Sequence, residues 1–96
     1  VTPRRFALSQ NTPNPSSPTT EIRYDVSASG GRVRLEVFDL SGRVVRRLVD
    51  EHVDGGRKSV NWDGRDDSGE RVASGVYCYR LTAPGYEKTL KMIVLK

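Results

Sequence analysis

The feature that most constrains the fold is an alternation of apolar and polar residues, interrupted at short intervals by turn-forming residues. Residues 22–26 alternate apolar and charged side chains, and residues 32–37 repeat the pattern after a Gly-Gly pair. Because alternate side chains of a strand point to opposite faces, each segment predicts a half-buried β-strand. Residues 59–62, 76–83 and 86–95 are also typical of strands. The chain therefore favours β-structure throughout.

The segment 44–49 is the one place where the pattern conflicts with this interpretation. Its paired apolar residues recur at helical spacing, but six residues between two glycine-containing turns are too few for a stable helix. We predict a strand with a β-bulge, which changes the face that points inward. Ser41-Gly42 before it predicts a two-residue hairpin turn, because glycine adopts the positive φ that such turns need.

Composition supports a single all-β domain. The 96 residues include twelve Val and only four Ala, a bias toward side chains that suit a pleated sheet. The single Cys excludes an intrachain disulfide, so stability must come from packing. Seven strands with regularly spaced turn signals predict a two-sheet antiparallel β-sandwich. No internal repeat or low-complexity run stands out.

The N-terminal part divides into three pieces. Residues 1–5 are interpreted as a linker remnant, and residues 6–8 are the first apolar anchor of a domain that we place at 6–96. Residues 11–20 then contain Pro13, Pro15 and Pro18, which predict an ordered strap resembling polyproline II that does not pair in a sheet. A disordered linker is the alternative for the strap.

Charge and hydropathy limit the partners. No apolar run approaches the roughly 20 residues of a membrane-spanning helix, and residues 1–10 do not resemble a signal peptide. Because the first residue is not Met, we interpret the chain as a piece of a longer protein. The formal net charge of +4 is small. It favours a solvated surface of mixed charge over a surface that binds nucleic acid or an anionic cell surface. We expect no nucleic-acid partner and no direct membrane insertion.

The stretch 61–81 concentrates the unusual residues: the only Trp, three of the seven Asp and two of the four Tyr. Asp63, Asp66 and Asp67, with Glu70 nearby, are weak candidates for a calcium site. Their spacing does not match an EF-hand, and Asp side chains commonly bond backbone amides in turns. We favour a rigid turn between two core strands and expect no cofactor.

Catalysis finds little support. His52 is the only histidine and lies in a polar turn, without a nucleophile motif around it. Cys78 lies between Tyr77 and Tyr79 in a predicted strand and is interpreted as an inert, partly buried thiol. We therefore predict that the chain is not an enzyme.

Two further groups have a structural and a binding interpretation. Trp62, Tyr77 and Tyr79 are predicted to be core residues, with a stacking platform for sugars or bases as the alternative. Five arginines gather on the second predicted hairpin and predict a basic outer edge, which either discourages edge pairing or binds a partner. They are Arg32, Arg34, Arg43, Arg46 and Arg47.

Over nearly its whole length the chain resembles the type A C-terminal sorting domains of type IX secretion system substrates. These are similar in turn to the immunoglobulin-like domain of flagellar hook-capping proteins. The matching residues include Pro13, Asn14, Pro15, Trp62, Asp63, Gly64, Gly75, Tyr77 and the closing Lys91, Met92, Ile93, Val94, Leu95 and Lys96. Thr12, Ser16 and Ser17 depart from the family pattern, which usually has aromatic residues and an Asn there.

This resemblance implies an immunoglobulin-like or fibronectin-III-like sandwich of about seven strands. It also implies a non-catalytic module behind an N-terminal cargo domain, recognised by the outer-membrane translocon and sorting machinery. Such a protein is secreted or held at the cell surface after passing through the periplasm. The contact residues would be 91–96, where a partner adds a strand or grips a short basic-apolar motif.

Two other functions stay open at this point. One is a structural assembly module of the hook-capping type, and the other is a carbohydrate-binding accessory domain that uses Trp62 and the tyrosines. We expect a monomer.

Overall fold

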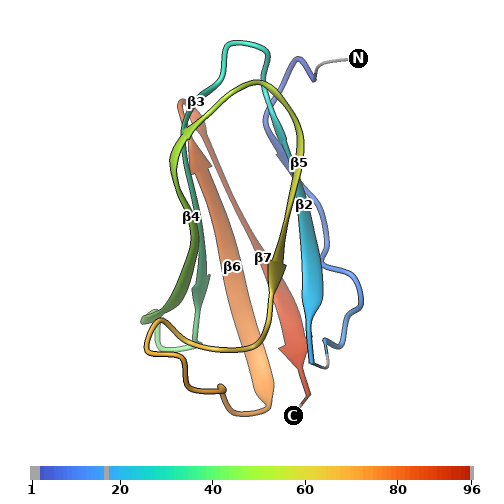
Figure 1. Ribbon diagram of the computed structural model, residues 1–96, viewed down its shortest axis with the longest axis vertical. Helices are drawn as coiled ribbons and strands as arrows, with labels where there is room; N and C mark the ends of the chain where they lie inside the picture. Colours follow the sequence, from blue (N-terminus) through green and yellow to red (C-terminus); the bar gives the residue numbers. More distant parts are fainter. Residues whose placement is uncertain (1–2, 17, 96) are drawn as a thin grey trace.

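A computed structural model of the protein describes residues 3–16 and 18–95, and they form a two-layered β-sandwich (Figure 1). Val1, Thr2, Ser17 and Lys96 lie outside the described residues. The strands are β1 (Ala7–Leu8), β2 (Thr20–Val26), β3 (Gly31–Phe38), β4 (Val44–Val53), β5 (Gly56–Trp62), β6 (Gly75–Ala83) and β7 (Tyr86–Val94). The predicted seven-strand immunoglobulin-like sandwich is confirmed, and no described segment is helical.

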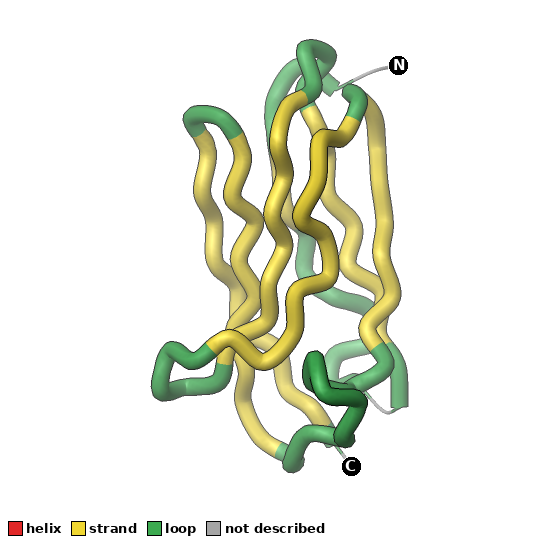
Figure 2. The backbone as a smooth tube through the Cα atoms, turned by 60° about the vertical axis from the view of Figure 1, so that its left-hand side comes forward, coloured by secondary structure: helices red, strands yellow, loops and turns green. Residues whose placement is uncertain are grey.

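Three strands form one sheet in the order β1-β2-β5, and four form the other in the order β4-β3-β6-β7. All of these pairings are antiparallel. The chain passes between the layers after β2, β4 and β5, so strands far apart in sequence become neighbours, as β3 and β6 do. Residues 39–43, residues 63–74 and the end of β7 consequently lie at one end of the sandwich (Figures 1 and 2).

The strand at 44–53 is irregular, as its helical spacing predicted. Its pairing with β3 shifts register between Leu35 and Glu36 and again between Val37 and Phe38. Each shift changes the face to which the following side chains point, because alternation along a strand is strict. The prediction of a strand with a bulge is confirmed.

The predicted two-residue turn at Ser41-Gly42 is wrong, because five residues connect β3 to β4. Gly42 has the expected positive φ of 89°. The loop is longer because the side chain of Asp39, rather than a second strand residue, accepts the amides of Ser41 and Arg43. A side-chain turn of this kind gives no signal in hydrophobic periodicity.

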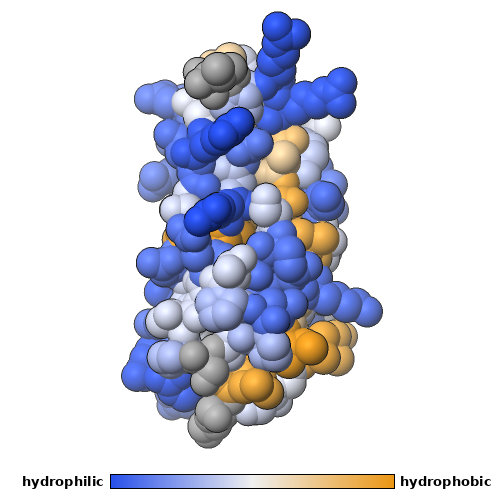
Figure 3. Space-filling model, turned by 90° about the vertical axis from the view of Figure 1, so that its right-hand side faces the viewer, coloured by the Kyte–Doolittle hydropathy of each residue, from blue (hydrophilic) through white to orange (hydrophobic). Residues whose placement is uncertain are grey.

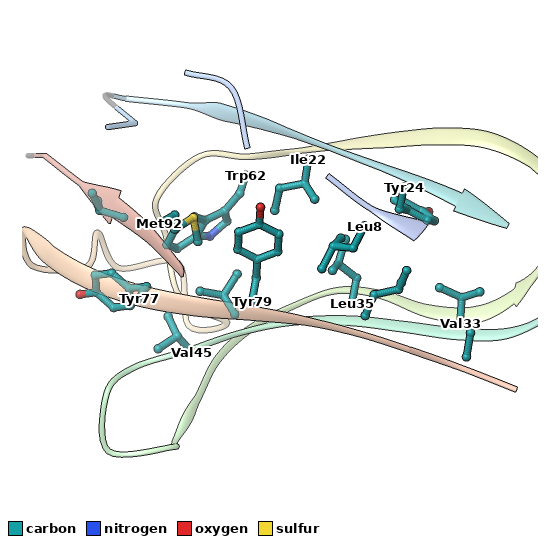
Figure 4. Close-up of a cluster of buried hydrophobic side chains, with 14 of the residues drawn as sticks. Leu8, Ile22, Tyr24, Val33, Leu35, Val45, Trp62, Tyr77, Tyr79 and Met92 are labelled. Carbon is teal, nitrogen blue, oxygen red and sulfur yellow. The ribbon is translucent and has the colours of Figure 1, made fainter. Parts of the chain in front are cut away.

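The core lies between the two sheets and contains the aromatic residues of the stretch 61–81 (Figure 4). Trp62 is 1 % exposed and Tyr79 is fully buried, while the Trp62 and Tyr77 rings meet edge to face with centroids 6.1 Å apart. Ring pairs in this arrangement contribute about 0.5–1.5 kcal/mol beyond their buried area. The prediction that these aromatics belong to the core is confirmed.

Residues 11–16 and 18–20 of the proline-rich segment form a strap along one side of the sandwich, and the peptide bonds before Pro13 and Pro15 are cis. The prediction that it does not pair is wrong at two points. Thr12 forms an isolated antiparallel bridge to Glu21, and Ser16 forms a parallel bridge to Val94. The strap therefore joins β2 of one sheet to β7 of the other.

Candidate functional site

The loop of residues 63–74 is held by the residues that flank it. The indole of Trp62 donates to the carbonyl of Arg65 at 2.9 Å, and the Asp63 carboxylate accepts the Arg65 amide at 3.0 Å. At the far end, the Tyr77 hydroxyl donates to the Ala73 carbonyl at 2.7 Å. Such a Tyr, bonded to backbone shortly before its own strand, is typical of immunoglobulin-like sandwiches. Hydrogen bonds to the side chains of Trp62, Asp63 and Tyr77 therefore fix both ends of the loop.

Gly64 gives this loop a backbone conformation that residues with a side chain rarely adopt. Gly64 is buried with a φ of +77°, in the left-handed region that favours glycine, and its carbonyl accepts the Val72 amide at 2.9 Å. Gly75 begins β6. The motif residues that carry the family resemblance thus close the loop.

Two Asp-x-Ser-Gly loops lie at this end of the sandwich, at residues 39–43 and 66–70, and their hydrogen bonds are the same. In each, one Asp oxygen accepts the Ser hydroxyl at 2.6 Å. The same oxygen also accepts the amides two and four residues later, at 2.9–3.0 Å. The sequence analysis missed this short repeat, which the recurrence of D-x-S-G signals directly.

These hydrogen bonds change the acidity of both Asp residues. The Ser41 hydroxyl and the Arg43 amide lower the pKa of Asp39, and the Ser68 hydroxyl and the Glu70 amide lower the pKa of Asp66. Donors that bond only the ionised carboxylate stabilise that form. Both loops therefore depend on a deprotonated Asp.

The calcium candidates do not converge. The Asp66 carboxylate is used within its own loop, and the Asp67 carboxylate accepts the Arg47 amide at 3.2 Å. Asp63 and Asp67 each lie within 4 Å of the Arg46 guanidinium. Within residues 3–16 and 18–95, no three His, Cys, Asp or Glu side chains are grouped to hold a metal. Asp63 and Asp66 each accept the backbone amide two residues later, which is the turn chemistry that the favoured interpretation describes.

The five arginines that were predicted to make the outer edge of the second hairpin basic all have carboxylate partners. Arg32 meets Asp50 at 2.8 Å, and Arg47 meets the buried carboxylate of Glu36 at 2.9 Å. The remaining three also have carboxylates within 4 Å: Arg34 with Asp50, Arg43 with Asp39, and Arg46 with Asp63 and Asp67. Alternation did not reveal these acidic partners, because several come from loops and the bulged strand.

The remaining candidate residues are either buried in the core or far apart from one another. Because Trp62 and Tyr79 are buried, the alternative of an aromatic platform for sugars or bases is wrong. His52 is near the end of β4, opposite Arg32, whereas Cys78 is near the start of β6, opposite Phe38. They therefore lie at opposite ends of the four-stranded sheet. No described helix is long and apolar enough to cross a membrane.

The closing residues divide between the two faces of β7. Met92 and Val94 point into the core and are 1 % and 5 % exposed. Ile93 and Leu95 point outward and are 43 % and 49 % exposed, and Lys91 is also exposed. Lys96 lies outside the described residues. Of the closing residues that the structure describes, Lys91, Ile93 and Leu95 are therefore the ones accessible at the surface.

The backbone edge of β7 is occupied in this region. The strap and Gln10, the residue before it, supply the partners. Ser16 exchanges two hydrogen bonds of 2.9 Å with the carbonyl of Ile93 and the amide of Leu95. The Asn14 side chain accepts the Ile93 amide at 2.9 Å, and the Gln10 side chain donates to the Lys91 carbonyl at 2.8 Å. A partner strand can add here only after the strap has left.

The sequence analysis did not predict that Tyr79 of β6 and Asn11 anchor the strap. The Tyr79 hydroxyl donates to the Ser9 carbonyl at 2.8 Å and accepts the Asn11 amide at 2.9 Å. The Asn11 side chain, 2 % exposed, donates to the Thr20 hydroxyl and the Pro13 carbonyl. These contacts join residues up to 70 apart, which local patterns do not reveal.

Comparisons place this geometry among known proteins. At a TM-score of 0.75 and 24 % identity, the chain is similar to dimeric latent PorU from Porphyromonas gingivalis, covering 99 % of this chain and 10 % of that one. The chain is also similar to PorZ, a surface component of the type IX secretion system of the same organism, at a TM-score of 0.65 and 23 % identity. That match covers 94 % of this chain and 12 % of PorZ. At these identities the likeness shows a shared fold.

A third structure, the flagellar hook-capping protein FlgD from Xanthomonas campestris, has a TM-score of 0.62 and 25 % identity. The match covers 92 % of this chain and 65 % of FlgD, so the chain spans only part of each of these three proteins. No curated protein matches the chain. The model of the FlgD Ig-like domain matches residues 10–85, most of the sandwich, and the chain belongs to the FlgD Ig-like domain family.

Proposed function

We propose that the chain is a non-catalytic C-terminal sorting domain, which directs a secreted or cell-surface protein through an outer-membrane type IX secretion system. The observation that carries the proposal is the last strand. Its residues Met92 and Val94 anchor it in the core, while Lys91, Ile93 and Leu95 present a basic-apolar motif at the surface. Folding holds these three side chains in a fixed arrangement, with Lys91 and Ile93 on one face of β7 and Leu95 directly after the strand.

Three findings support the proposal. The motifs at Trp62, Gly75 and residues 91–96 are those by which the chain resembles type A sorting domains. The chain belongs to the family to which those domains are related. Its fold is also that of a domain in PorZ, a surface component of a type IX secretion system.

The proposal defines the partners. The translocon and sorting machinery of the outer membrane bind the domain after it has crossed the periplasm, and the N-terminal cargo precedes residue 6. Residues 3–6 lie at the end of the sandwich opposite to the end of β7 (Figure 1), so the cargo and the sorting motif are kept apart. The domain acts as a monomer.

The test is a reporter with a periplasmic signal peptide, fused in front of residues 1–96. It is expressed in a bacterium that has a type IX system and in an isogenic strain without its outer-membrane translocon. The Ig-like domain of Xanthomonas campestris FlgD, fused in the same way, is the control for the fold alone. Export of the 1–96 fusion that requires the translocon, without export of the control, supports the proposal. Export of neither, or of both equally, contradicts it.

A second candidate is an assembly module of the hook-capping type, which the FlgD family match and the FlgD structure favour. Such a module binds a filament or itself. Light scattering of the isolated chain at high concentration distinguishes the two, because a sorting domain stays monomeric. A strict monomer argues against self-assembly.

A further inference from the structure

The large exposed apolar side chains gather in one place. Among the described residues four are at least 38 % exposed: Leu40, Val76, Ile93 and Leu95. Val76 and Ile93 are directly opposite each other on β6 and β7, and Leu95 is the exposed residue directly after β7. In Figure 3 apolar surface lies at the lower end of the molecule, where the C-terminus lies in Figure 1, and also in patches higher up that face.

Two half-buried residues join these four across the sheet. Phe38 pairs with Cys78, which lies two residues from Val76 and therefore on the same face. Phe38, Leu40 and Cys78 line a hollow of about 230 Å³. The outer patch is thus made of Phe38, Leu40, Val76, Cys78, Ile93 and Leu95.

The hollow has the size of an anchor site for one side chain. Its volume is below the range of about 300–1,000 Å³ that is typical of small-molecule sites. One wall is formed by Arg80, whose guanidinium lies 4.8 Å from the centre of the Phe38 ring and also donates to the Thr89 hydroxyl. Pockets that take one bulky side chain are typical of binding hot spots between proteins.

Three positive side chains border the patch, and Lys91 is the one of them that has no ion pair with a described residue. Arg43 and Arg80 border the patch but face Asp39 and Glu87 at 3.8 Å and 3.7 Å. Lys91 is opposite Cys78 and makes no ion pair with any described residue. Charge complementarity therefore calls for a carboxylate beside the apolar anchor.

We propose that the outer patch docks a protein segment that places a bulky apolar side chain beside Leu40 and a carboxylate at Lys91. The inference rests on the proposed function and identifies its contact: a component of the secretion machinery would carry this segment. Because the strap occupies the β7 edge, docking uses side chains and needs no strand addition. A second copy of the chain is disfavoured, since it would bring a second Lys91 to the same surface.

The first test uses isolated, isotope-labelled protein and the synthetic peptides Glu-Phe-Asp-Leu-Glu and Lys-Phe-Lys-Leu-Lys, followed by NMR. The acidic peptide is expected to shift the amides of residues 38–40, 76–78 and 91–95 and to bind at least tenfold more tightly than the basic one. The double variant Leu40→Ser with Ile93→Thr is expected to lose at least tenfold in affinity. Lys91→Glu weakens binding several-fold, whereas its control Lys88→Glu, on the other face of β7, does not.

The second test places the same variants in the exported reporter fusion, after their thermal stability has been shown to equal that of the parent. The double variant and Lys91→Glu are expected to lower export at least fivefold, and Lys88→Glu is not. If the parent fusion is not exported, the proposed function is wrong. The peptide titration then remains the test of whether the outer patch binds an acidic, apolar segment. Normal export of the double variant, equal binding of both peptides, or binding only to phosphatidylglycerol vesicles overturns the inference.

Discussion

The side-chain oxygen of Asn14 accepts a hydrogen bond of 2.9 Å from the backbone amide of Ile93, 79 residues away. It takes the place that a neighbouring strand would have at the edge of the four-stranded sheet. Exposed edges invite pairing with other chains, and covering them prevents it. The strap and the last strand therefore form one unit, so changes in the strap alter what residues 91–95 can bind.

Replacing Asn14 tests this coupling. Asn14→Ala removes the acceptor of the Ile93 amide, which costs about 1 kcal/mol and lowers the melting temperature by about 4–8 °C. Hydrogen exchange of the Ile93 amide should accelerate. Asn61→Ala is the control, because the Asn61 side chain is exposed and makes no hydrogen bond with a described residue. Equal exchange in the two variants would show that Asn14 does not hold the edge.

Tyr79→Phe is expected to be more destabilising, because the Tyr79 hydroxyl serves both the Ser9 carbonyl and the Asn11 amide. Leaving such buried groups unpaired costs about 1–3 kcal/mol each. Tyr77→Phe, which loses a single bond to Ala73, is the comparison. Chemical denaturation measures both, and a Tyr79→Phe variant as stable as the parent would contradict this role.

The same residue predicts a response to alkali. Burial raises the pKa of Tyr79 from 10.0 to about 12. Between these values the unfolded chain loses the proton and the folded chain keeps it, so stability is complete below pH 10 and falls as the pH rises toward 12. In Tyr79→Phe this fall should be smaller. A slope of melting temperature against pH that is unchanged by the substitution would exclude Tyr79 as its source.

The paired Asp loops predict a response to acid. Since the pKa values of Asp39 and Asp66 are lowered by folding, their contribution is present above the usual Asp value of 3.8 and is lost as the pH falls below it. Asp39→Ala and Asp66→Ala should lower stability at neutral pH and flatten its loss in acid. Asp54→Ala is the control, because that carboxylate is 93 % exposed. Melting temperatures measured from pH 7 to pH 2 test this prediction. An equal loss of melting temperature in the parent and in all variants would refute the role of Asp39 and Asp66.

Much of the fold follows from residue patterns, and the remainder depends on long-range contacts. Alternation in residues 22–26 and 32–37 located two strands, because burial on one face imposes a period of two. The bulge in β4 was predicted correctly, because each register shift interrupts the alternation of side chains and leaves apolar residues at a spacing that resembles a helix. The five-residue turn at 39–43 and the occupied edge of β7 were not predicted, because they depend on side chains and on contacts between distant parts of the chain.

The proposed domain boundary leads to a truncation test. Removing residues 1–5 should leave the melting temperature unchanged, because Arg4 and Arg5 are exposed and the first apolar side chain packed against the core is Phe6, whose ring lies 6.0 Å from that of Tyr86. Removing residues 1–8 also deletes β1 and the buried Leu8, and should lower it by about 10 °C or more. Equal stability of the two truncations would place the boundary later in the chain.

The most direct test of the central claim is the ratio of reporter in the medium to reporter in the cells, measured for the fusion to residues 1–96. We predict that this ratio is at least tenfold higher in the strain with a type IX translocon than in the isogenic strain without it. Equal ratios in the two strains, with the domain shown to be folded in both, would contradict a role in sorting.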